Sequence, residues 1–108
     1  MTEIFSHNAY ALPVNHDQVR SEWAAQGFSF GVFRDPPGQQ WNDFSHTTDE
    51  YVLVAKGQLQ VSVGSQSNIV GEGALVRIPK HTSHSLKTLS AGGSVWLYGY
   101  GHWDQEND

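Results

Sequence analysis

Short runs in which hydrophobic and polar residues alternate occupy most of the chain after residue 27. The clearest run places Leu59, Val61 and Val63 at every second position. Side chains two residues apart share one face of a β-strand, so this pattern predicts strands with one buried face. Glycine and proline separate the runs about every eight to twelve residues, a spacing typical of all-β sandwiches and barrels. We expect strands at residues 28–34, 41–46, 50–55, 58–63, 68–70, 74–78, 84–89 and 94–100.

One segment before these runs has the features of a helix. The pattern predicts a short helix over His16–Gln26, with Asn15 as its N-cap and a capping-box glutamine three residues later. Val19 and Trp23 are four residues apart and would form its buried stripe. We expect the helix to pack against, or cover, an all-β domain: a small antiparallel β-barrel or jelly roll.

Composition limits the classes of partner. The 108 residues are 38% hydrophobic and 16% charged, which predicts a single folded domain over residues 1–108. A net charge of -5 argues against nucleic acid and anionic membranes as partners. No apolar stretch approaches the ~20 residues of a membrane helix, and the first residues do not resemble a secretion signal. The absence of cysteine excludes disulfides and thiolate ligands and fits a cytoplasmic protein.

Two polar residues at the start of an apolar run point to a possible metal site. His46 precedes Glu50 by four residues, a spacing that would place both on one helix face. The β-branched and aromatic residues that follow favour a strand instead, in which Glu50 shares a face with Val52 and Val54. A carboxylate directed into the core is costly unless it is paired, and a metal ion would remove that cost. His84, which points inward from a later strand, is the candidate third partner.

The spacing around these residues resembles the first motif of the cupin family. That motif runs Gly, five residues, His, one residue, His, three or four residues, Glu, six residues, Gly. Every spacing is kept here, at Gly38, Phe44, His46, Glu50 and Gly57, and only the first histidine is replaced, by Phe44.

A later segment resembles the second cupin motif, which runs Gly, five residues, Pro, one residue, Gly, two residues, His, three residues, Asn. Gly73, Pro79 and His84 match it, whereas His81 and Thr88 replace the second glycine and the asparagine. The stretches WNDFSHTTDE and WLYGY are similar to those of small single-domain cupins. The resemblance implies a cupin barrel.

The resemblance also implies a metal site. The matching ligands are His46, Glu50 and His84, and they would hold one divalent ion per chain, which could be Fe, Mn, Ni or Zn. Two histidines and one carboxylate form a ligand set that leaves open positions around Fe(II). The alternative is a hydrogen-bonded polar cluster without metal. His81 is expected at the rim of the pocket rather than as a fourth ligand, and strand parity places Asp43 opposite Phe44.

Aromatic residues could line a pocket for a small-molecule ligand or substrate. Phe44, Trp41, Tyr98 and His81 are the candidates. Such rings also fill cores and interfaces. A small barrel cannot easily bury four tryptophans and nine other aromatic residues, so we expect a homodimer.

Three hypotheses for function follow. The first is a metal-dependent enzyme for oxygenation, isomerisation or decarboxylation of a small organic molecule, with His81 and Tyr98 as weak candidates for a general base. The second is a binding or sensing module that captures a metal or small ligand without turnover. The third is a barrel that has no metal and serves assembly. Metal content and turnover of a substrate distinguish the three.

Overall fold

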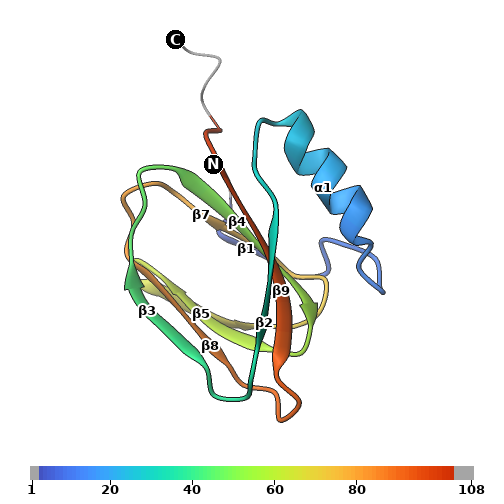
Figure 1. Cartoon of the computed structure of the whole chain (residues 1–108). Coiled ribbons are helices and arrows are strands. Elements are labelled where there is room, and N and C mark those ends of the chain that lie inside the picture. The colour runs from blue at the N-terminus through green and yellow to red at the C-terminus, as the bar shows by residue number, and fades with distance from the viewer. Residues whose placement is uncertain (1–2, 104–108) are drawn as a thin grey trace.

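The computed structural model describes residues 3–103, which form two facing β-sheets and a helix (Figure 1). Strand follows strand along most of the chain, as the alternation predicted. The elements are β1 (Phe5–Ser6), α1 (His16–Ala25), β2 (Gly31–Asp35), β3 (Gln40–Phe44), β4 (Asp49–Lys56), β5 (Leu59–Val63), β6 (Gln66–Val70), β7 (Leu75–Ile78), β8 (His84–Thr88) and β9 (Ser94–Gly101).

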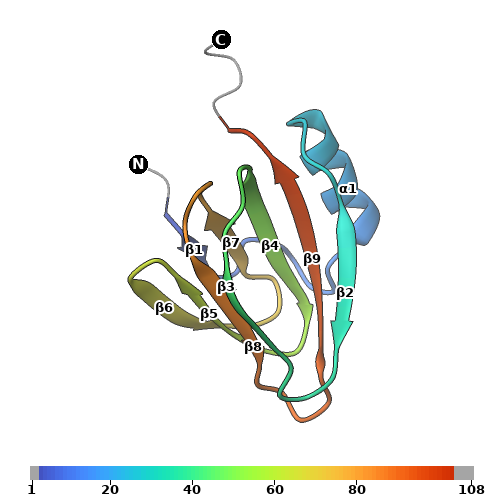
Figure 2. The same ribbon diagram turned by 60° about the vertical axis from the view of Figure 1, so that its left-hand side comes forward.

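The two sheets enclose the interior of a jelly-roll barrel (Figure 2). The five-stranded sheet has the order β1-β7-β4-β9-β2, and the four-stranded sheet has the order β3-β8-β5-β6. All neighbouring strands pair antiparallel. The prediction of an all-β barrel with one short N-terminal helix is therefore confirmed.

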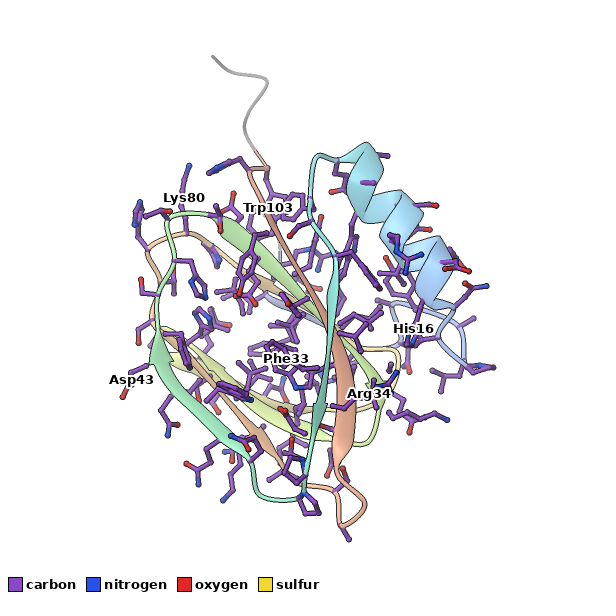
Figure 3. All side chains as sticks on the ribbon, viewed as in Figure 1. His16, Phe33, Arg34, Asp43, Lys80 and Trp103 are labelled. Atoms are coloured by element: carbon purple, nitrogen blue, oxygen red, sulfur yellow. The ribbon has the colours of Figure 1, made fainter. Side chains whose placement is uncertain are left out.

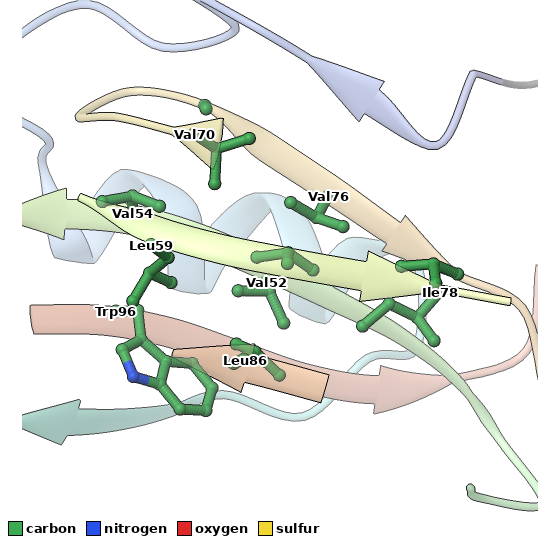
Figure 4. Close-up of a cluster of buried hydrophobic side chains, with 11 residues drawn as sticks. Val52, Val54, Leu59, Val70, Val76, Ile78, Leu86 and Trp96 are labelled. Carbon is green, nitrogen blue, oxygen red and sulfur yellow. The ribbon is translucent and has the colours of Figure 1, made fainter. Parts of the chain in front are cut away.

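Hydrophobic side chains from both sheets, most of them aliphatic, fill the barrel (Figure 4). Their alternation in sequence follows the pleat, since β5 buries every second residue and exposes or half-exposes the others. Burial of this apolar area is the main driving force for the sheet packing. The buried set comprises Val52, Val54, Leu59, Val61, Val63, Val70, Ala74, Val76, Ile78, Leu86 and Trp96.

The helix covers the outer face of the five-stranded sheet and creates a second core there (Figures 1 and 2). Val19 and Trp23 are buried beneath it, and the Trp23 ring stacks on Tyr51 with 5.2 Å between ring centroids. Asn15 caps the helix, as predicted, by accepting a hydrogen bond from the backbone N–H of Gln18. β4 is consequently buried on both faces. Among the described residues, no helix has the length and apolar character needed to cross a membrane.

This second core accommodates many of the aromatic side chains on which the dimer prediction was based. Within residues 3–103, the exposed large hydrophobic side chains are Leu12, Phe44, Ile69 and Leu89, of which only Phe44 is aromatic. The crowding of aromatic residues therefore gives less support to a dimer than the composition suggested. Association into a homodimer stays a prediction.

Three strands differ from their expected bounds by two residues or more. The strand expected at residues 68–70 begins earlier, at Gln66. The strand expected at residues 28–34 begins only at Gly31. Phe28 lies outside the strand because its side chain packs into the core under the helix. The strand expected at residues 41–46 ends at Phe44, and a bulge between Trp41 and Phe44 interrupts its pairing with β8. Asp43 occupies the bulge with φ of +59°, and its backbone N–H donates a hydrogen bond to Ser85 Oγ. The two-residue strand β1 was not predicted.

Candidate metal centre

Glu50 is the second residue of the central strand β4, and its carboxylate points into the barrel. It pairs with Ile78 of β7 and Tyr100 of β9, on the same face as Val52. The residue is only 3% exposed. The parity argument from the sequence thus placed this side chain on the correct face.

His84 opens β8 and reaches the same point from the opposite sheet. It pairs with Val63 and Phe44 and is also 3% exposed. Its Nδ1 lies 3.0 Å from the carbonyl oxygen of Thr82. Because a carbonyl oxygen only accepts, Nδ1 carries the proton and Nε2 is directed toward the carboxylate of Glu50.

His46 lies in the loop between β3 and β4 and is half-buried. The loop is held by the backbone, since the N–H of His81 donates to the carbonyl oxygen of His46 at 2.8 Å. The imidazole packs edge-on against the ring of Tyr100, with centroids 5.0 Å apart. His46 is therefore positioned beside the carboxylate by a turn and by an aromatic neighbour.

The three side chains converge on one point. Glu50 Oε1 lies 3.3 Å from His84 Nε2 and 3.6 Å from His46 Nε2. One ligand atom from each residue lies within 4.8 Å of the other two, and no other group of three or more such residues is found in residues 3–103. This arrangement brings together the three residues that the sequence singled out.

The carboxylate lacks a partner. Glu50 Oε1 is buried and has no hydrogen-bond partner among the described residues, and it lies 3.3 and 3.6 Å from Nε2 of His84 and His46. With Nδ1 of His84 protonated, a neutral imidazole presents its Nε2 lone pair to this oxygen. The Nε2 lone pair and the carboxylate oxygen are both acceptors, and the buried negative charge of Glu50 has no partner, which is unfavourable. A cation between the two atoms would interact favourably with each of them. The donor set therefore fits a divalent metal ion.

The electrostatics of the cluster agree with its need for positive charge. Burial lowers the pKa of His84, but the adjacent Glu50 carboxylate and the hydrogen bond to the Thr82 carbonyl outweigh burial. The pKa of His84 is consequently above the ordinary imidazole value. Burial and the charge of Glu50 also raise the pKa of Tyr100 to about 12, so its hydroxyl is protonated at neutral pH.

A cavity of about 120 Å³ lies beside the cluster. Its walls are mainly aromatic and come from both sheets. Phe44 is 39% exposed, and its ring centroid lies 6.3–6.4 Å from those of both imidazoles. The lining residues are Phe33, Trp41, Phe44, His46, Glu50, His84, Leu86, Trp96 and Tyr100.

Two of the four predicted pocket residues line this cavity, and two do not. Trp41 and Phe44 line it, because the bulge at Asp43 places both on the inner face. His81 is exposed in the turn before β8 and contributes its backbone rather than its ring. Tyr98 packs its ring over Gly31, where a Cβ atom would lie 2.3 Å from the ring. Asp43 is exposed and points away from the barrel (Figure 3).

Two buried carboxylates outside the cluster accept hydrogen bonds that the sequence did not indicate. Asp35 Oδ2 accepts from the indole N–H groups of Trp41 and Trp96, at 2.8 and 2.9 Å. Asp49 accepts from the backbone N–H groups of Lys80 and Trp103, at 2.9 and 3.0 Å. In the sequence, Asp35 stands before Pro-Pro-Gly and has the pattern of an ordinary turn, so no signal indicated its role.

A larger hollow, of about 590 Å³, lies at the opposite end of the five-stranded sheet. It is open to the surface and is lined by residues that include Arg34, Lys56 and Gly93. It contains no histidine, and the candidate ligands converge elsewhere. The smaller aromatic cavity is therefore the candidate functional site.

Comparisons with known proteins agree with this architecture. The chain is similar to an RmlC-like cupin from Shewanella frigidimarina, with 14% identity and a TM-score of 0.64 over 75% of this chain and 71% of that one. The cupin domain of Schizosaccharomyces pombe Cnp3 is 17% identical, with a TM-score of 0.67 over 74% of this chain and 59% of that one. A cupin 2 conserved barrel domain protein from Rhodopseudomonas palustris is 23% identical, with a TM-score of 0.63 over 68% of this chain and 51% of that one. These likenesses show the fold.

Sequence comparison identifies the family. No curated protein matches the chain significantly. A family model described as a cupin domain matches residues 31–100, well over half of the chain, and both resembling motifs fall within that range. The chain belongs to the cupin family.

Proposed function

We propose that this cupin binds one divalent metal ion through His46, Glu50 and His84 and acts as an enzyme on a small organic molecule in the adjacent cavity. The observation that carries the metal proposal is the orphaned oxygen of Glu50, which is buried between two imidazole nitrogens. A fold without a metal has no need for that arrangement, since a buried carboxylate without partners costs stability.

The ligand set supports chemistry at an open coordination position. Two histidines and one carboxylate are too few to close the shell of Fe, Mn, Ni or Zn. A metal ion held there would act as a Lewis acid on a carbonyl or enol oxygen. Oxygenation, isomerisation and decarboxylation are the reaction classes that we propose.

The neighbouring residues of the chain would orient the substrate. Tyr100 lines the cavity beside His46, and its raised pKa keeps its hydroxyl available as a hydrogen-bond donor. His81 and Tyr98 do not line the cavity, which removes the support for either as a general base. A binding or sensing module remains the alternative, and it predicts the same metal content without turnover.

Elemental analysis of protein purified without a metal-affinity tag tests the metal proposal. We expect close to one divalent ion per chain in the wild type and little in a His84→Ala variant. The matched control is His102→Ala, which removes an exposed histidine outside the cluster and should leave metal content unchanged. A wild type that holds no metal, and whose melting temperature does not respond to Fe, Mn, Ni or Zn salts, would refute it.

Two further proposals concern context. A cytoplasmic location is supported by the absence of cysteine from the chain. A homodimer would be supported by the exposed ring of Phe44 and by the exposed Ile69 side chain.

A further inference from the structure

The part of the cavity that lies beside the cluster has room for about one ring. It measures about 120 Å³, whereas pockets for drug-sized ligands have about 300–1,000 Å³. An apolar cavity of about 150 Å³ is known to hold benzene. Phe44 at the mouth is partly exposed, so substituents could project past it, but the part beside the cluster is small.

The walls are flat and fixed in place. Phe33 lies between the two indoles, with centroids 5.3 Å from Trp41 and 4.8 Å from Trp96. Both indoles are held from behind by Asp35, whose Oδ2 accepts from their N–H groups. Trp41 in turn packs against Phe44 at 6.0 Å. Because the indole N–H groups are already engaged, these walls offer ring faces rather than hydrogen bonds, and they favour a flat apolar body.

The charge of the lining limits the charge of the ligand. Glu50 is the only acidic residue among the nine lining residues, and none of them is lysine or arginine. With neutral imidazoles and a divalent ion, the centre carries a net charge of +1. One negative charge on a ligand would balance it, whereas a phosphate or a second carboxylate would lack a partner.

We propose that the cavity takes a flat molecule of one-ring size whose single acidic oxygen end, a phenol, catechol or enol, faces the His46–Glu50–His84 cluster. This inference rests on the proposed function, because the charge balance requires the metal ion. It excludes sugars, which are neither flat nor acidic, and it excludes phosphorylated substrates. The aromatic walls and Glu50 could instead attract an organic cation if no metal were bound.

Calorimetric titration of the Zn²⁺-loaded protein with catechol tests the proposal. The controls are cis-1,2-cyclohexanediol, which has the same number of heavy atoms without flatness or acidity, and 3,4-dihydroxybenzoate, which adds a second charge. Tetramethylammonium tests the cation alternative. We expect catechol to bind at least about tenfold more tightly than each of the three.

Matched variants locate the binding. Phe44→Ala removes a half-exposed wall, so the variant should fold, retain Zn²⁺ and bind catechol about threefold to tenfold more weakly. Phe30→Ala removes an aromatic ring outside the barrel and should leave the affinity for catechol unchanged. Far-UV circular dichroism and zinc content are measured for each variant.

The outcomes separate the two proposals. A chain that retains no Zn²⁺ would overturn both of them. A chain that retains Zn²⁺ but prefers the cyclohexanediol, the dihydroxybenzoate or tetramethylammonium, or does not discriminate, would overturn only the ligand class. Weakening of catechol binding by Phe30→Ala to the same extent as by Phe44→Ala would also overturn it.

Discussion

Replacement of Glu50 by glutamine should stabilise the metal-free protein and abolish its stabilisation by metal. In the wild type, a carboxylate that is 3% exposed presents an unpaired oxygen to two imidazoles. Glutamine removes the charge, and its amide N–H can donate to the Nε2 lone pair of His84. An unsatisfied buried polar group costs about 1–3 kcal/mol, and more when it is charged. We therefore expect Glu50→Gln to raise the free energy of unfolding by about 1–3 kcal/mol.

The adjacent carboxylate provides a matched control with the opposite expected sign. Asp49 is 4% exposed, but both of its oxygens accept backbone hydrogen bonds, from Lys80 and Trp103. In the Asp49→Asn variant, the amide oxygen still accepts one of these two backbone hydrogen bonds, but the NH₂ group faces the other backbone N–H and cannot accept from it. Loss of one hydrogen bond to a charged acceptor costs about 1.5–3 kcal/mol, so Asp49→Asn should destabilise by that amount.

The assay is urea denaturation of EDTA-treated protein near pH 9, followed by tryptophan fluorescence. At that pH ordinary imidazoles are neutral. For a domain of about 100 residues, each 1 kcal/mol also shifts the melting temperature by about 4–8 °C, which gives an independent check. Addition of Zn²⁺ should raise the stability of the wild type but not of Glu50→Gln. If Glu50→Gln is less stable than the metal-free wild type, the argument for an orphaned carboxylate is wrong.

Four other predictions follow. Because the pKa of His84 is raised, its contribution to the stability of the metal-free protein should be complete below about pH 6.5. This contribution should be lost as the pH rises through the raised pKa of His84. Denaturation of the metal-free wild type at several pH values should show this loss of stability, and His84→Asn should not show it. The Zn²⁺-loaded protein should show the opposite trend, because protons displace the metal. Phe44→His should raise Zn²⁺ affinity by at least about tenfold by adding a third imidazole as a fourth ligand, and calorimetry with unchanged affinity would contradict it. Light scattering should give twice the 12.0 kDa chain mass if the chain dimerises.

Much of the fold could be predicted because local pattern and burial agree. The alternation of Leu59, Val61 and Val63 matches their inward direction, and the helix begins at the cap that Asn15 indicated. The second core was harder to predict. Tyr51 and Leu53 alternate with inward valines, yet they are equally buried because α1 lies over them. Alternation alone does not reveal which strand face a distant helix will cover.

The candidate site was only partly visible in the sequence. His46, Glu50 and His84 could be grouped from strand parity and the motif spacing, and the structure brings them together. Asp35 could not be recognised, since its partners are Trp41, six residues later, and Trp96, across the barrel. Such a contact depends on the packing of the two sheets, which short-range pattern does not encode.

The bulge in β3 explains how the pocket and the candidate ligands come to share one wall. Strict alternation would place Trp41 and Phe44, three residues apart, on opposite faces of the strand. The extra residue at Asp43 instead pairs them with Leu86 and His84, so both rings face inward. The bulge therefore directs position 44, where the family motif has a histidine, toward the cluster. Because a phenylalanine stands there, this position supplies an apolar wall for a substrate instead of a further ligand for a metal.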